Sequence, residues 1–173
     1  MDRVGTRTTR LVVLRGPSGA GKSTTARLLR EHLGRSVALI EQDYLRRVVL
    51  KELDRPGGGA PDLISLVARY ALGLGLSVIV EGILGAAHHT PMLQRLAADH
   101  QGRTIFYRFD VSWPETVRRH AVRPQADEFG IEEMRRWWHG LDPLPFVEEQ
   151  VIPESSSLDS TVARILSEAF GEA

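Results

Sequence analysis

The chain has 173 residues, a formal net charge of zero, and 42% hydrophobic and 25% charged residues. This length and balance are typical of one folded domain, and we expect residues 1–173 to form a single domain. A net charge of zero gives no general attraction to nucleic acids or membranes, so a nucleic acid partner is not favoured. Because the chain has no cysteine, disulfides, thiolate catalysis and cysteine-bound zinc are excluded.

Targeting and membrane-spanning segments are not indicated by the sequence. No apolar run approaches the ~18 residues that a transmembrane helix needs, and the first residues do not follow a signal-peptide pattern. We therefore expect a cytoplasmic protein without a membrane partner. No pattern indicates its oligomeric state.

The first predicted elements are a strand, a glycine-rich loop and a helix. Residues 11–14 are fully apolar, as in a buried strand of a parallel sheet. Residues 16–23 fit the phosphate-loop pattern G-x-x-x-x-G-K-[ST] at every specified position. Apolar residues then recur at helical spacing up to Gly34, which is a typical helix C-cap residue.

This loop predicts a site for ATP and Mg²⁺. Glycines allow the backbone to wrap around a phosphate, and the start of the helix adds the positive end of its dipole. Lys22 would reach the β- and γ-phosphates, and the Ser23 hydroxyl would bind Mg²⁺. The residues expected to hold the nucleotide are Gly16, Pro17, Ser18, Gly19, Ala20, Gly21, Lys22, Ser23 and Thr24.

Between residues 37 and 72 the pattern predicts a strand and two helices. Residues 37–40 form a second short apolar run, and Asp43 lies just beyond it. Residues 45–53 keep helical spacing until a stretch rich in proline and glycine over 54–61, which we expect to be a flexible loop. A second apolar helix is predicted over residues 62–72.

The next segment continues the alternation of strands and helices. Residues 77–81 predict a strand that ends in Glu81. Thr90 followed by Pro91 is typical of a helix N-cap with proline in the first turn. Residues 104–110 then predict another strand.

The C-terminal part begins with a predicted capping box. Ser112 and Glu115 have the spacing of this motif, and we expect them to open a helix that ends before residue 124. The remaining predicted elements are a helix over 131–139, a strand over 147–152, and a final helix capped by Ser156 or Ser157.

The order of these elements predicts the fold. Strands that alternate with helices favour an α/β architecture of three layers, with a five-stranded parallel sheet covered by helices on both faces. Ligands of such sheets bind at the carboxyl ends of the strands. The phosphate loop, Asp43 and Glu81 should therefore lie at one edge of the sheet.

Two acidic residues at that edge are candidates for chemistry. Asp43 could accept the proton of an attacking hydroxyl, or it could cap the helix that follows it. Glu81 could bind the hydrated Mg²⁺ or the substrate, or it could be an exposed acid at a strand end. Arg46, Arg47 and His88 are further candidates for binding the substrate.

Arginines crowd the helix that follows Ser112. Arg119 and Arg123 are four residues apart, so they share a helix face and repel each other. A polyphosphate opposite that face would explain this arrangement. The alternative is a solvated face on which Glu115 pairs with Arg119.

Two further features, taken with the phosphate loop, resemble a known family. They are the pair Asp43-Tyr44 and the run from Trp113 through Glu115 and Arg119 to Arg123. They are similar to the P-loop kinases of the polynucleotide kinase, zeta-toxin and chloramphenicol phosphotransferase-like group. The resemblance implies that Asp43 is the general base. It also implies that Arg119 and Arg123 bind the ATP phosphates from a short lid over about residues 118–130.

These features predict an ATP-dependent kinase that transfers the γ-phosphate to a hydroxyl group. The acceptor could be a small molecule, a nucleoside or nucleotide, or the 5′ end of a polynucleotide. The alternatives are a non-catalytic nucleotide-binding module and a toxin-like kinase controlled by a partner protein. A GTPase switch is excluded because no N-K-x-D motif is present. A dinucleotide site is excluded because Thr24 replaces the third glycine of its loop.

Overall fold

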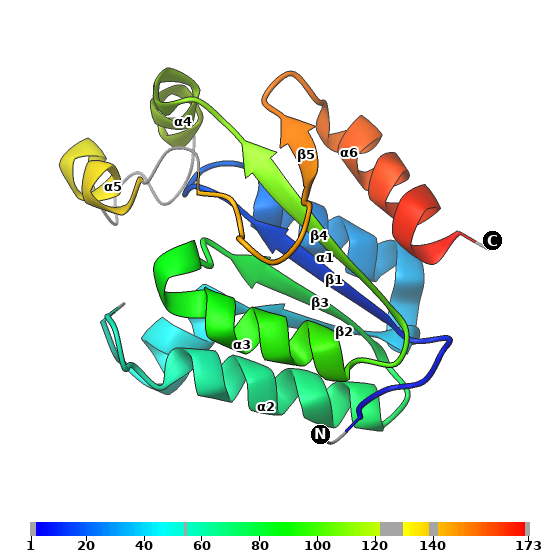
Figure 1. The fold of residues 1–173 in the computed structure, drawn as a ribbon. Coiled ribbons are helices and arrows are strands. Elements are labelled where there is room, and N and C mark those ends of the chain that lie inside the picture. The colour runs from blue at the N-terminus through cyan, green and yellow to red at the C-terminus, as the bar shows by residue number, and fades with distance from the viewer. Residues whose placement is uncertain (1–2, 54, 122–129, 139–141, 172–173) are drawn as a thin grey trace.

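A computed structural model gives the structure of residues 3–53, 55–121, 130–138 and 142–171. Its centre is a five-stranded sheet in the order β2-β3-β1-β4-β5, and every neighbouring pair is parallel (Figure 1). The strands are β1 (Arg10–Arg15), β2 (Val37–Glu41), β3 (Ser77–Gly82), β4 (Arg103–Asp110) and β5 (Gln150–Pro153).

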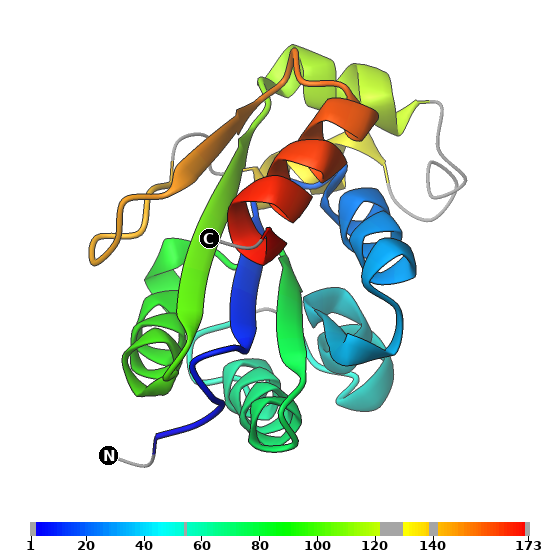
Figure 2. The ribbon, with the colours of Figure 1, turned by 90° about the vertical axis from the view of Figure 1, so that its right-hand side faces the viewer.

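Helices cover both faces of the sheet. Helices α2 and α3 lie on one face and α1 and α6 on the other, while α4 and α5 lie beyond the carboxyl ends of the strands (Figures 1 and 2). Their bounds are α1 (Lys22–Leu33), α2 (Ala60–Gly73), α3 (Ala86–Asp99), α4 (Trp113–His120), α5 (Ile131–Trp137) and α6 (Leu158–Ile165). In the described part of the chain, none of the helices has the length and apolarity to cross a bilayer.

Alternate residues of β1 face the two hydrophobic cores. Leu11 and Val13 pack against the side of α2 and α3, and Val12 and Leu14 pack against the side of α1 and α6. All four are at most 1% exposed. A strand buried on both faces reads as a continuous apolar run, so the predicted three-layer fold with a parallel sheet is confirmed.

The helix predicted after Asp43 is shorter than expected and has a different geometry. The segment η2 (Tyr44–Val49) is a π-helix, and Lys51 then takes a left-handed conformation with φ 52°. The side chain of Glu52 accepts hydrogen bonds from the N–H groups of Gly59 and Ala60. This side chain therefore caps the start of α2.

The predicted start of α3 at Thr90 is wrong. The helix begins one turn earlier, at Ala86, and Pro91 lies inside it. The N–H of Ala86 donates to Asp142 Oδ2 at 2.8 Å. A partner 56 residues away supplies the cap, which local sequence patterns cannot indicate.

Near the C-terminus, the capping box of Ser112 and Glu115 is not formed. Glu154 accepts hydrogen bonds from the N–H and the hydroxyl of Ser112, at 2.9 and 2.7 Å. Glu115 instead binds arginines of its own helix. Strand β5 and helix α5 occupy slightly different bounds from those predicted, whereas the expected capping role of Ser157 is confirmed.

A buried arginine joins β1 to the end of the chain. Arg15 is 1% exposed and lies 2.9 Å from Asp142 and 3.0 Å from Glu149. Its Nε also donates to the carbonyl of Leu84 at 3.2 Å. Such a pair is held by its hydrogen bonds, and removing one partner leaves buried charge without compensation.

We expect Arg15→Met to lower the free energy of unfolding by about 3–5 kcal/mol, because the carboxylates of Asp142 and Glu149 would lose this partner. Urea denaturation measures the change. Arg27→Met is the control, because the Arg27 side chain that pairs with Glu41 is 63% exposed and should contribute less than about 1 kcal/mol. Equal losses in the two variants would contradict the assigned role of Arg15.

Candidate active site

The phosphate loop follows β1 and turns through glycines in the left-handed region. Gly16 has φ 145°, and a Cβ there would lie 2.7 Å from the carbonyl oxygen of Phe109. Gly21 has φ 99° and is the N-cap residue of α1. Other residues rarely adopt these angles, so the path of the loop depends on glycine at both positions.

Lys22 is the first residue of α1, and its side chain lies over the loop. Its Nζ donates to the carbonyl of Pro17 at 2.7 Å, and the residue is only 6% exposed. The next residue, Ser23, donates its hydroxyl to Glu81 Oε1 at 3.1 Å. The start of α1 is thereby linked to the end of β3.

Glu81 is buried at the carboxyl end of β3. Burial raises the pKa of Glu81 above its ordinary value of 4.5, while the nearby Lys22 charge and the Ser23 hydroxyl act in the opposite direction. A carboxylate and a hydroxyl side by side are hard oxygen ligands, which suit Mg²⁺. Within the described residues, no group of three or more histidine, aspartate and glutamate side chains could hold a metal.

A cavity of about 550 Å³ surrounds these residues, and we call it the phosphate-loop cavity. Most of the predicted nucleotide-binding residues line it, namely Ser18, Gly19, Gly21, Lys22, Ser23 and Thr24. Gly16 and Pro17 border a small recess beside Arg15. Arg27, Glu41 and His120 also line the phosphate-loop cavity, although no sequence pattern had singled them out.

Asp43 stands at the edge of this cavity and does not cap a helix. The residue precedes η2, but its side chain makes no capping hydrogen bond. Its Oδ1 accepts a hydrogen bond from Arg46 at 2.9 Å and lies 3.9 Å from Arg47 Nε. The side chain is 60% exposed, so it can meet a ligand.

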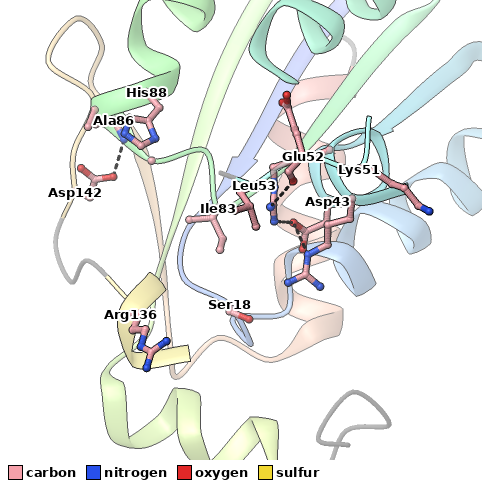
Figure 3. Close-up of a pocket in the computed structure, with 14 residues that line it drawn as sticks. Ser18, Asp43, Lys51, Glu52, Leu53, Ile83, Ala86, His88, Arg136 and Asp142 are labelled. Carbon is pink, nitrogen blue, oxygen red and sulfur yellow. Dashed lines mark hydrogen bonds and ion pairs between the residues drawn. The ribbon is translucent and has the colours of Figure 1, made fainter. Parts of the chain in front are cut away.

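A second cavity of about 810 Å³ lies beside the first, and we call it the α3 cavity because residues 85–88 line it (Figure 3). The predicted substrate residues Asp43, Arg46, Arg47 and His88 line it, whereas Glu81 lines the phosphate-loop cavity. The two cavities share four lining residues, which are Ser18, Asp43, Arg47 and Ile83.

Ile83 lines both cavities, and the next residue, Leu84, is held in a strained conformation by Gln42, which sequence reasoning missed. Leu84 is fully buried and has φ 45°, a left-handed angle for a non-glycine residue. Its N–H donates to Gln42 Oε1 at 3.1 Å, and its carbonyl accepts from Arg15. Gln42 is 1% exposed and also contacts His89. Because Gln42 directly precedes Asp43, these contacts fix the segment after Glu81 against the segment that carries Asp43.

The two predicted lid arginines have different outcomes. Arg119 lies near the phosphate loop, where it donates to the carbonyl of Ala20 at 3.1 Å and to that of Glu154 at 2.8 Å. It also binds Glu115, so the predicted helix pair is present as well. Arg123 and most of the predicted lid over 118–130 lie outside the described residues.

Glu115 on α4 is strongly favoured in its ionised form by its two arginine partners. Hydrogen bonds from Arg118 and Arg119 lower the pKa of Glu115 to about 2. Arg119 also borders a smaller cavity of about 180 Å³ beside Ala20 and Gly21. The far wall of this cavity comes from the turn between β5 and α6, at Pro153 and Ser156. No sequence pattern indicated this cavity.

The buried carboxylate of Glu81 leads to a prediction for the protein without nucleotide or Mg²⁺. Because the pKa of Glu81 is raised in the folded state, its ionisation opposes folding as the pH rises above about 4.5. Glu81→Gln removes that cost and keeps an acceptor for Ser23. We expect the variant to have a larger free energy of unfolding than the native protein at neutral pH, with the difference vanishing at acidic pH.

Urea denaturation from about pH 4 to about pH 8 measures this difference. Glu31→Gln on the exposed face of α1 is the control for the loss of one negative charge. A stability gain that does not change with pH would contradict the assignment to burial of Glu81.

Comparison with protein families places the chain among known sequences. A family model described as an AAA domain matches residues 11–140. This match includes the phosphate loop, Asp43, Glu81 and Arg119. A comparison with curated proteins gives no match.

Solved structures share the fold. The APS kinase CysC of Mycobacterium tuberculosis, solved with AMPPNP and APS, has a TM-score of 0.67 at 19% identity over 95% of this chain and 97% of that one. A gluconokinase from Sinorhizobium meliloti 1021 has a TM-score of 0.59 at 17% identity over 96% and 92%. A chain of the Pnkp1/Rnl/Hen1 RNA repair complex has a TM-score of 0.58 at 17% identity and covers 79% of this chain and 43% of its own.

Proposed function

The chain belongs to the AAA domain family, and we propose that it is an ATP-dependent kinase acting on a hydroxyl group of an acceptor molecule. The observation that carries this proposal is the position of Asp43. This carboxylate lines both the phosphate-loop cavity and the α3 cavity. A kinase needs such a group, because the acceptor and the terminal phosphate must meet at one point.

The phosphate-loop cavity would hold the polyphosphate. The loop backbone and the start of α1 favour anions, and Lys22 would exchange its contact with Pro17 for the phosphates. Mg²⁺ would be held beside Ser23 and Glu81, where it would neutralise charge on the β- and γ-phosphates. The nucleoside would extend toward Arg119 and the cavity beside Ala20.

Asp43 would orient the acceptor hydroxyl and take its proton. The acceptor oxygen would then form a bond to the γ-phosphorus, while the bond between that phosphorus and the β-phosphate oxygen breaks to give ADP. Arg46 would hold the Asp43 side chain in place for this role, because it donates a hydrogen bond to Oδ1 of Asp43. No hydrogen bond within the described chain uses Oδ2, so this oxygen is available to the acceptor.

The similar structures support a kinase more than a binding module. The APS kinase and the gluconokinase bear kinase names and match nearly the whole chain. A non-catalytic module would use the phosphate loop but would have no use for Asp43 between two cavities. A toxin-like kinase controlled by a partner protein remains the second candidate within the same chemistry, since it would need the same site.

Lys22→Ala should abolish phosphoryl transfer while the fold is retained, because the Lys22 side chain lies over the phosphate loop and belongs to neither hydrophobic core. We expect a loss of about 10³-fold or more in turnover. The measurement is ADP release with hydroxyl compounds as acceptors, together with circular dichroism to verify folding. Near-native turnover in this variant would make the phosphate-loop assignment wrong.

Asp43→Asn separates catalysis from nucleotide binding. The amide keeps the size of the side chain but cannot accept the hydroxyl proton, so acceptor-dependent turnover should fall about 10²- to 10⁴-fold. ATP affinity and melting temperature should stay near native, because Asp43 lies at the cavity edge and caps no helix. Calorimetry measures binding, and a coupled assay measures ADP.

Asp62→Asn on the exposed surface of α2 is the matched control for this variant. Equal turnover in the native protein and in Asp43→Asn, with ATP still bound, would favour the non-catalytic module. A loss of stability with unchanged turnover would reduce Asp43 to a structural residue.

A further inference from the structure

The α3 cavity contains more charge than the proposed transfer of a phosphoryl group to a hydroxyl requires. Its charged lining residues are Asp43, Arg46, Arg47, Lys51, Glu52, Arg136 and Asp142. Four of these are cations and three are anions. The partners of each group decide what charge remains for a ligand.

The acidic side chains of this cavity are already engaged by the protein. Asp142 pairs with the buried Arg15 and accepts the N–H of Ala86. Glu52 accepts the first N–H groups at the start of α2 at 2.6 and 3.0 Å. Asp43 accepts a hydrogen bond from Arg46. Each carboxylate charge is therefore largely compensated, and the lining as a whole favours an anion.

Two of the four cations of the lining, Arg136 and Lys51, make no hydrogen bond or ion pair with other residues that the structure describes. Arg136 is the one that stands across the cavity from Asp43 (Figure 3). Glu132 and Glu133 lie four and three residues before it on α5, at the spacing that favours helix ion pairs. Glu133 instead accepts the N–H of Gly130 at 2.9 Å. Arg136 therefore lines the cavity without an ion pair to any residue in the described ranges.

Helix α5 is anchored, so Arg136 has a defined position. Met134 is 1% exposed and lies against the phosphate loop. Its Cε is 4.0 Å from the position that a Cβ on Gly19 would take. Arg135 lies 5.2 Å from the centre of the Trp113 ring on α4, and Trp138 contacts the same ring at 5.9 Å. These contacts hold the residues on both sides of Arg136.

The cavity places the positive charge of Arg136 away from Asp43, the residue proposed to meet the acceptor hydroxyl. Arg136, His88 and Asp142 stand on one side of the cavity, and Asp43 stands on the other (Figure 3). We propose that the acceptor is a small molecule with a carboxylate or phosphate group that binds Arg136, remote from the hydroxyl that meets Asp43. This proposal rests on the proposed kinase function.

The rest of the lining fits the body of such a molecule. Leu53, Ile83, Ala86 and Ala87 supply apolar surface, and Leu53 and Ile83 lie between the two ends (Figure 3). A volume of about 810 Å³ lies in the range typical of pockets for small molecules. The anion would bind a planar guanidinium, which suits both carboxylate and phosphate geometry.

The test measures anion binding while the phosphate loop is filled. Protein saturated with Mg²⁺ and a non-hydrolysable ATP analogue is titrated with inorganic phosphate in one arm and with acetate in the other. Nuclear magnetic resonance follows the Arg136 Nε–H and the backbone amides of Ala87 and His88. We expect saturable shifts of these signals, and the stronger arm identifies phosphate or carboxylate as the preferred group.

Arg136→Gln is the decisive variant, and Arg95→Gln is its matched control. Arg95 is exposed on α3 and lines none of the cavities described above. The dissociation constant from the Ala87 and His88 signals should rise about tenfold or more in Arg136→Gln, because one charge-assisted contact is lost. It should stay native in Arg95→Gln. Absence of saturable shifts in both arms, or equal binding in both variants, overturns the proposal.

A second measurement separates this proposal from the kinase itself. ADP release is compared for matched acceptors, such as gluconate with glucose and glycerate with glycerol. Turnover of the acids, with KM raised in Arg136→Gln and kcat little changed, supports the proposal. Turnover of the neutral partners at equal KM supports the proposed kinase function and refutes the anion site. Anion binding at Arg136 without any turnover supports the anion site and counts against the proposed kinase function.

Discussion

The buried guanidinium of Arg15 connects the segments on which both cavities depend. It lies at the end of β1, directly before the phosphate loop, and it binds Asp142, Glu149 and the carbonyl of Leu84. Asp142 in turn caps α3, and Leu84 follows Ile83, which forms part of the wall shared by the cavities. A buried charge must have its partners in place, so this one side chain fixes the relative positions of loop, wall and helix.

The two acidic residues of the site differ because of where the strands end. Glu81 is still inside β3, paired with Leu14 of β1 in the register, and is 4% exposed. Asp43 lies beyond the end of β2 and is largely exposed. Burial raises the pKa of Glu81, so this carboxylate ionises less readily when no cation lies beside it. Exposure leaves the second one able to meet a ligand that enters from solvent.

Local patterns were sufficient to predict the sheet, the phosphate loop and the strand-end position of Asp43. Apolar runs and glycine spacing are short-range signals, and the structure agrees with them. The start of α3 and the cap of α4 could not be predicted, because Asp142 and Glu154 supply the contacts from far along the chain. The role of Gln42 was missed for the same reason. Its partners Leu84 and His89 become neighbours only when β2 and β3 pair.

These long-range contacts imply that the site is assembled by the C-terminal part of the chain. Residues 142–154 contribute Asp142 to the α3 cavity and the Glu154 carbonyl that holds Arg119. Asp142 is held by Arg15, whereas Glu154 directly follows β5, in which Pro153 lies opposite Asp110 of β4. The angles of the phosphate loop are set by its own glycines, but its place at the sheet edge also depends on Phe109, against which Gly16 packs, and on the partners of Arg15. The α3 cavity and the Arg119 contact need residues 142–154 in addition, so the complete site forms only when this later part of the chain is in place.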